Sequence, residues 1–328
     1  MNIEQRVCRA ERKLEKFEDP DWTVDGARRA TVPLVELETL WINTGTLCNI
    51  ECVNCYIDSS PRNDALVYIT AAEVGCFLDE IEGEGLATRE IGFTGGEPFM
   101  NPDILAMLGD ALGRGYEVLV LTNAMKPMLR PRLRHGLEDL RERYGARLTL
   151  RVSLDHYTRA LHEKERGGDT WAKALEGLDW LSGHGFRLAI AGRTCWGEDE
   201  ARERQGYADL IAKHGWRIDP TDHSELVLLP EMDEAIDVPE ITTACWDLLG
   251  KDPSDIMCAK SRMVVKRKGA SRPTVLPCTL IVFNEAFDMG PTLKAAAAAD
   301  GGMFRDGEVK LCHAHCSKFC VLGGGSCS

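Results

Sequence analysis

The chain has 328 residues, of which 44% are hydrophobic, and a formal net charge of −13; this length allows one large or two modest domains with a sizeable core. The acidic balance argues against non-specific binding of nucleic acid or of an anionic membrane surface. The sequence contains no run of 18 apolar residues, so we expect no membrane span. The charged segment Met1–Val7 lacks the hydrophobic core of a signal peptide, so we expect a cytoplasmic protein in which 13 cysteines indicate metal or redox chemistry rather than disulfides.

The N-terminal part predicts an amphipathic helix over residues 3–18 and a connection over residues 19–33. We expect no room there for a fused peptide-binding domain of ~80 residues. From residue 36 onward, strands and helices alternate. The predicted strands cover residues 36–43, 89–93, 116–123, 147–155, 187–192 and 224–231, and the predicted helices cover residues 71–84, 102–114, 129–144, 170–183 and 198–214.

These strands are nearly continuous apolar runs, which is typical of a parallel α/β sheet with helices outside. Periodicity alone leaves open whether such a sheet closes into a barrel. Active groups in parallel sheets gather at the C-terminal ends of the strands. Polar residues and glycines follow the predicted strands at these positions, so we expect the functional site there.

Three cysteines follow the first predicted strand in the spacing C-x3-C-x2-C: Cys48, Cys52 and Cys55. Three thiolates on one short loop can point at one metal site, and iron–sulfur clusters are held by cysteine thiolates, usually four. A cubane with three protein thiolates leaves one iron open to a small chelating ligand. Zinc is the alternative, but structural zinc sites use four ligands and no fourth Cys or His lies near this loop.

A second motif, Thr94-Gly-Gly-Glu-Pro98, follows the second predicted strand. Gly95 and Gly96 would let backbone carbonyls approach a ligand closely, and Glu97 supplies a carboxylate beside them. This combination suits an ammonium group. The same residues could also form an ordinary turn between a strand and a helix.

Together the two motifs resemble those of the radical S-adenosylmethionine (SAM) enzymes, and the resemblance covers about residues 34–232. It implies a partial (β/α)6 TIM-like barrel and a [4Fe-4S] cluster on the three cysteines, with the open iron chelating the amino and carboxylate groups of SAM. One electron from the reduced cluster would cleave SAM to methionine and a 5′-deoxyadenosyl radical that abstracts hydrogen from a substrate. The expected reductant is a protein of the flavodoxin or ferredoxin type.

The resemblance also implies SAM contacts at the strand ends. Ser153 and Asp155 suit the ribose hydroxyls, and Arg166, predicted to open the helix over residues 170–183, suits the methionine carboxylate. Each could instead be an ordinary turn or ion-pair residue, and so could Arg193, which we expect at the cavity mouth. The remaining candidate contacts are Tyr56, whose position matches a backbone contact to adenine in the family, Asn123, which could bond the methionine or ribose part, and Gly192.

The remaining third of the chain is rich in cysteine. A β-hairpin is predicted between Cys258 and Cys278, with its turn at Lys268–Ala270 and its return strand at Val275–Leu276. A helix that ends in the alanine run at residues 295–299 follows. The remaining cysteines of this part are Cys245, Cys312, Cys316, Cys320 and Cys327.

This arrangement resembles the auxiliary-cluster extensions called SPASM and Twitch. The resemblance implies one auxiliary [4Fe-4S] cluster on Cys258, Cys278, Cys316 and Cys320, with Cys327 as a possible replacement ligand and Cys312 as a further candidate. The usual late C-x2-C is absent, because the tail reads C-x3-C-x3-C and then C-x6-C. A zinc knot is the alternative. The expected organisation is an N-terminal part at 1–33, a radical SAM core at 34–235 and the auxiliary-cluster domain at 236–328.

An auxiliary cluster could accept the electron left after hydrogen abstraction, bind substrate or pass electrons onward. Families with this extension often modify ribosomal peptides, and others oxidise or rearrange small molecules such as sugars and amino sugars, so both substrate classes stay open. A redox-sensing iron–sulfur protein and a zinc-stapled structural protein are the non-enzyme alternatives. The intact motif at residues 94–98 favours an enzyme, because a protein that only holds a cluster has no need of an ammonium site.

Overall fold

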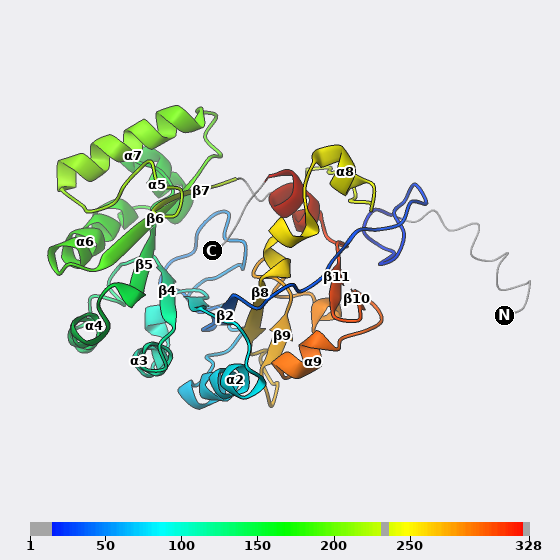
Figure 1. Cartoon of the computed structure of the whole chain (residues 1–328). Helices are drawn as coiled ribbons and strands as arrows, with labels where there is room; N and C mark the ends of the chain where they lie inside the picture. Colours follow the sequence, from blue (N-terminus) through cyan, green and yellow to red (C-terminus); the bar gives the residue numbers. More distant parts are fainter. Residues whose placement is uncertain (1–14, 231–235, 324–328) are drawn as a thin grey trace, which may run out of the picture.

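A computed structural model describes residues 15–230 and 236–323 of the chain. One eight-stranded sheet runs through it, in the order β7-β6-β5-β4-β3-β2-β8-β9 (Figure 1). The strands from β7 to β8 are mutually parallel, and β9 returns antiparallel to β8. Their bounds are β2 Thr39–Asn43, β3 Glu90–Thr94, β4 Glu117–Thr122, β5 Leu148–Ser153, β6 Arg187–Arg193, β7 Leu226–Leu229, β8 Ser261–Val265 and β9 Thr274–Leu276.

Helices cover the outer face of the sheet (Figure 1). Alternate side chains of each strand face them and form the main core, whereas the others face inward, where Trp41, Leu119 and Met263 form a smaller buried cluster. Gly92 on β3 makes room for Trp41, since a Cβ there would lie 2.4 Å from its ring. The helices are α2 Ala71–Glu84, α3 Ile104–Gly113, α4 Pro131–Tyr144, α5 Arg159–Arg166, α6 Thr170–Gly183, α7 Glu200–His214, α8 Cys245–Leu249 and α9 Leu293–Ala297.

The sheet does not close, because β7 and β9 are its two edges. Six parallel strands from β2 to β7 with helices between them form the partial (β/α)6 barrel that the sequence predicts. The six predicted strands and five predicted helices of this part are all present, with ends that differ by a few residues. The α/β fold class is therefore confirmed.

Two details of the prediction are wrong. Arg166 does not open the helix over residues 170–183; it is the last residue of the separate, short helix α5, which the sequence analysis missed. The predicted N-terminal helix does not extend over residues 15–18, which contain a turn, and its residues 3–14 lie outside the described part of the chain.

The C-terminal third contributes the predicted hairpin, in which Met263 of β8 pairs with Leu276 of β9. Because β8 also pairs with β2, the hairpin continues the main sheet. A second sheet joins β1 (Thr31–Val32) to β11 (Glu308–Lys310) and β10 (Phe304–Arg305), so the chain before the barrel pairs with the cysteine-rich tail.

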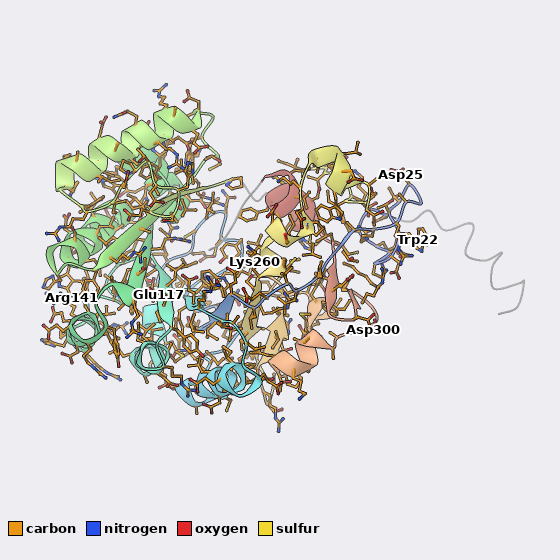
Figure 2. The ribbon with its side chains drawn as sticks, viewed as in Figure 1. Trp22, Asp25, Glu117, Arg141, Lys260 and Asp300 are labelled. Carbon is orange, nitrogen blue, oxygen red and sulfur yellow. The ribbon has the colours of Figure 1, made fainter. Side chains whose placement is uncertain are left out.

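A buried ion pair fastens the same region. The Arg29 guanidinium lies 2.5 Å from the Glu240 carboxylate, and it also donates to the carbonyl of Leu311 beside the tail cysteines. Figure 2 shows Trp22 and Asp25 of the N-terminal loop at the opposite end of the molecule from Arg141 on α4. Across the described residues, no helix combines the length and the apolar character that a membrane crossing needs.

Candidate functional site

A cavity opens at the C-terminal ends of the barrel strands, where the sequence predicts the site. Its walls come from the loop after β2, the ends of β3 to β7, the end of α5 and two residues of the C-terminal third. The predicted site residues that line it are Cys48, Cys52, Cys55, Tyr56, Gly95, Gly96, Asn123, Ser153, Asp155, Arg166 and Gly192. The structure thus brings together the whole predicted set for the first cluster and SAM except Glu97.

The three cysteines of the first motif lie on the loop after β2. The Cys48 thiol is buried, and the Asn123 amide Nδ2 lies 3.8 Å from its Sγ. The backbone N–H of Ser59 donates to the Cys55 thiol at 3.3 Å. Burial raises the pKa of Cys48 to about 12 and that of Cys52 to about 11, so both thiols hold their protons until a metal displaces them.

Glu165, at the end of α5, anchors this loop. Its carboxylate accepts hydrogen bonds from the backbone N–H and the side-chain amide of Asn54, both at 2.9 Å, and its own carbonyl accepts one from the N–H of Val53. The Arg193 guanidinium completes the arrangement with a buried ion pair to Glu165 at 2.7 Å. Sequence reasoning missed Asn54 and Glu165, and it placed Arg193 at the cavity mouth with an ion pair as the alternative.

The glycines of the second motif pack against the start of the cysteine loop. A Cβ on Gly96 would lie 2.2 Å from the Leu47 carbonyl oxygen, and one on Gly95, whose φ is +143°, would lie 2.6 Å from that of Gly45. The backbone N–H of Gly96 donates to the Gly45 carbonyl at 2.7 Å. No other residue type fits between these two backbones without moving one of them.

The Glu97 side chain lies behind the cavity wall and is 1% exposed. Its carboxylate accepts hydrogen bonds from the Thr122 hydroxyl at 2.8 Å and from the backbone N–H groups of Phe99 and Asn123 at 3.1 and 2.9 Å. Burial raises the pKa of Glu97 to about 7, although these donors oppose the shift. In this structure Glu97 ties the end of β3 to the end of β4 and so fixes Asn123 beside Cys48.

Asp155 and Arg166 both line the cavity and are hydrogen-bonded to each other. The Arg166 guanidinium donates to both carboxylate oxygens of Asp155, at 2.6 and 3.0 Å. Electrostatic coupling also links the guanidinium to Cys52, since it opposes the rise in the pKa of that thiol that burial causes. A planar cation of this kind, next to the thiols of the loop, can receive a carboxylate in two parallel hydrogen bonds.

A second, smaller cavity lies in the C-terminal third. Four cysteines line it: Cys258 from a short 3-10 turn before β8, Cys278 after β9, and Cys316 and Cys320 from a π-helical segment at Cys316–Leu322. The sequence predicts these four as auxiliary-cluster ligands, and the structure brings them together. Most of the other lining residues are apolar, and His315 also reaches the wall.

The two further candidates behave differently. The Cys312 thiol does not line the second cavity; it donates to the carbonyl of Phe17 at 3.0 Å. Cys327 lies outside the described residues. In the ranges 15–230 and 236–323, no three His, Cys, Asp or Glu side chains are arranged to hold a single metal ion.

The two cavities share one wall. Leu280 lines both of them, and Phe319, the neighbour of Cys320, lines the first. Leu280 therefore belongs both to the wall beside the first three cysteines and to the wall beside the other four. The donor sets fit iron–sulfur chemistry, because soft thiolates are the ligands that such clusters take.

Comparison with known proteins agrees with this geometry. Residues 42–203 match the model of the radical SAM superfamily. The chain is 29% identical over 145 residues to the antilisterial bacteriocin subtilosin biosynthesis protein AlbA of Bacillus subtilis (strain 168), covering 44% of this chain and 30% of AlbA. It is 28% identical over 203 residues to GTP 3',8-cyclase of Rhodococcus opacus (strain B4), covering 54% of this chain and 58% of the cyclase.

The fold is similar to that of Streptococcus suis SuiB in its crystal structure bound to S-adenosylmethionine. The TM-score is 0.58 at 13% sequence identity, covering 82% of this chain and 66% of SuiB. The alignments to AlbA and the cyclase cover less than two thirds of either relative. The chain belongs to the radical SAM superfamily, and the resemblance seen in its two motifs is confirmed. Homologues in this superfamily are enzymes, so this chain is a radical SAM enzyme.

Proposed function

We propose that this radical SAM enzyme carries one auxiliary [4Fe-4S] cluster beside its first cluster and modifies a peptide. The observation that carries the proposal is the pair of cysteine-lined cavities that meet at Leu280. Cys48, Cys52 and Cys55 would hold the first cluster. When bound, that cluster supplies the electron that cleaves SAM, and the radical produced removes hydrogen from a substrate.

The residues around the first cavity would bind and orient SAM. Arg166 offers a guanidinium to its carboxylate, and Asp155 and Ser153 offer acceptors to the ribose hydroxyls. The backbone of Gly95 and Gly96 would approach the ammonium group, and Tyr56 the adenine. Asn123 and Gly192 complete the wall. Glu97 would act through Thr122 and Asn123, since its carboxylate already accepts three hydrogen bonds.

The second cavity would hold the auxiliary cluster on Cys258, Cys278, Cys316 and Cys320, with Cys327 as the alternative fourth ligand. The first cavity, where a substrate would lie beside SAM, shares the wall residue Leu280 with it. When bound there, an oxidised cluster would supply an acceptor for the electron that remains on a substrate after loss of a hydrogen atom. A flavodoxin- or ferredoxin-type protein would supply electrons to the first cluster.

The peptide substrate rests on the relatives. AlbA is named for bacteriocin biosynthesis, and one solved structure of SuiB is bound to the precursor peptide SuiA. The second candidate substrate is a small molecule, and the alignment to GTP 3',8-cyclase over 54% of this chain favours it.

Cysteine variants test the two-cluster proposal. After anaerobic reconstitution we expect Cys316→Ala and Cys320→Ala each to contain about four fewer irons than the wild type while keeping reductive SAM cleavage. Cys48→Ala should keep about four irons and lose cleavage. An unchanged iron content in both tail variants would contradict the auxiliary cluster, and retained cleavage in Cys48→Ala would contradict the first site.

The substrate class is tested separately with 5′-deoxyadenosine formation as the readout. The reduced enzyme is incubated with SAM and either short peptides encoded beside its gene or a panel of nucleotides. We expect a peptide to accelerate 5′-deoxyadenosine formation. We also expect that peptide to lose hydrogen, which mass spectrometry detects as a decrease in its mass. Acceleration by a nucleotide alone would overturn the peptide assignment in favour of the small-molecule one.

A further inference from the structure

Arg262 on β8 is a buried cation with unused donors. Arg262 is 2% exposed, and its Nη1 donates to the carbonyls of Cys258 and Ser261 at 2.5 and 2.8 Å. The Nε and Nη2 groups have no hydrogen-bond partner among the described residues. Within the same residues the guanidinium has the Cys258 thiol, and no carboxylate, as its electrostatic partner.

Such an arrangement is unfavourable in an otherwise folded core. A buried charge without a counter-charge is strongly unfavourable, because nothing offsets the loss of its hydration, and each unmade hydrogen bond adds to this cost. Arg29, a second deeply buried arginine of this region, has a partner for each of its donor nitrogens. Arg29 directs its three donor nitrogens to three carbonyls and to the Glu240 carboxylate.

The position of Arg262 indicates where its counter-charge belongs. It lies four residues after Cys258 and donates to the Cys258 carbonyl, and electrostatic coupling links its guanidinium to the Cys258 thiol. A free thiol is neutral at pH 7 and adds no counter-charge, whereas a metal-bound cysteine is a thiolate. The missing anion therefore arrives with whatever the four cysteines of the second cavity bind.

We propose that Arg262 is the charge partner of the auxiliary cluster and raises its reduction potential. The inference rests on the proposed auxiliary cluster. One-electron reduction adds a negative charge to the cluster, and a guanidinium in a low-dielectric surrounding stabilises the reduced state more than the oxidised one. Arg262 would thus make the cluster a better acceptor for an electron from the neighbouring substrate space.

The experiment uses the full chain with Cys48, Cys52 and Cys55 all changed to Ala, so that one cluster remains. Its midpoint potential is measured by anaerobic redox titration followed by electron paramagnetic resonance, in this background and with Arg262→Gln or Arg262→Lys added. We expect Arg262→Gln to shift the potential to a more negative value and Arg262→Lys, which keeps the charge, to shift it less.

Arg267→Gln is the matched control. Arg267 lies on the same hairpin, but its guanidinium is paired with Asp288 at 2.5 Å and its side chain is 16% exposed. This variant removes an equal charge and should leave the potential unchanged. An equal potential in the background and in Arg262→Gln, or equal shifts in the Gln and Lys variants, would overturn the inference.

The iron content of each variant is measured as well, because Arg262→Gln could fail to assemble the auxiliary cluster. If Arg262→Gln loses its iron and Arg262→Lys keeps about four irons, the cation is needed to hold the cluster, and the potential of Arg262→Lys decides the rest: a more negative value than the background supports the inference, and an equal value overturns it. If both variants lose their iron, the shape of the side chain and not its charge is what matters, and the inference fails. A background protein that binds no iron would overturn the auxiliary cluster itself, which is a failure of the proposed function.

Discussion

The guanidinium of Arg166 donates two hydrogen bonds to the Asp155 carboxylate, at 2.6 and 3.0 Å, and both residues line the first cavity. Asp155 follows β5, and Arg166 ends α5. The two side chains were predicted to bind different parts of SAM, and the structure adds that they orient each other. The Nε and Nη2 groups of Arg166 donate to Asp155, so the guanidinium keeps only its remaining N–H groups for a ligand.

Arg166→Gln should weaken SAM binding. The change removes a charge-assisted, two-pronged contact to a carboxylate, which is worth about 1.5–3 kcal/mol; we therefore expect the Kd for SAM to rise at least about tenfold. Anaerobic equilibrium binding to the reconstituted protein measures it. Arg159→Gln, on the exposed face of the same helix, is the control. Equal affinities in the wild type and Arg166→Gln would show that Arg166 does not bind SAM.

Glu165→Gln should loosen the first cluster. The new amide would point an N–H at the Asn54 amide that now donates to Glu165, and it would remove the buried carboxylate charge 2.7 Å from the Arg193 guanidinium. We expect iron of the first cluster to pass to a chelator roughly tenfold faster, which corresponds to ~1.4 kcal/mol. Glu163→Gln, on the same helix, should release iron at the wild-type rate. Identical rates in both variants would rule out an anchoring role for Glu165.

Gly96→Ala should displace the cysteine loop. Its Cβ would lie 2.2 Å from the Leu47 carbonyl oxygen, so one of the two backbones has to move. We expect a loss of about 1–3 kcal/mol in the free energy of unfolding, as for other overpacked sites, and iron content lower by about four per chain.

Gly83→Ala is the matched control for that prediction. Gly83 lies near the exposed end of α2, where a Cβ meets no atom within 4 Å. Alanine there should stabilise the protein by about 0.5–1 kcal/mol. If Gly96→Ala were as stable as the wild type and kept its iron, the close approach of the two backbones would not matter for the cluster.

Glu203 should make stability depend on pH. It is fully buried on α7, neither carboxylate oxygen has a hydrogen-bond partner among the described residues, and burial together with Glu198 raises its pKa to about 7. Since the folded state binds the proton more tightly than the unfolded chain, the free energy of unfolding falls as pH rises from about 4.5 to about 7, by at most roughly 3 kcal/mol.

Glu203→Gln removes the titrating group, so the variant should gain stability over the wild type as pH rises through this window. Urea unfolding between pH 5 and pH 8 measures the difference. Asp209→Asn, an exposed change on the same helix, should leave the wild-type slope intact. Parallel wild-type and Glu203→Gln curves would contradict the raised pKa.

Local signals made much of the fold predictable. The spacing of Val74, Phe77, Leu78 and Ile81 predicts the helix at Ala71–Glu84 at its observed bounds. In the structure, a capping box of Thr70 and Glu73 begins this helix and Gly85, with a φ of +65°, ends it. Helix α5 carries no such signal. Its eight residues are mostly charged, and the two side chains that it buries are His162 and Glu165. Hydrophobic periodicity therefore could not find it, and Arg166 was assigned to the next helix.

Some residues of the site are likewise predictable from local sequence, and others are not. The cysteines and the Gly95–Gly96 pair are visible because their chemistry depends on close spacing along the chain. The Asn54–Glu165 contact joins residues 111 positions apart, and only the folded barrel brings them together. The orientation of Glu97 is likewise a tertiary property, because its partner Thr122 belongs to the neighbouring strand.

The most direct test of the central claim is iron and sulfide content measured on the same anaerobic sample as reductive SAM cleavage. A radical SAM enzyme with an auxiliary cluster should contain about eight irons per chain and form 5′-deoxyadenosine when reduced with dithionite. About four irons with cleavage would contradict the auxiliary cluster, and full iron content without cleavage would contradict the SAM site at the ends of the barrel strands.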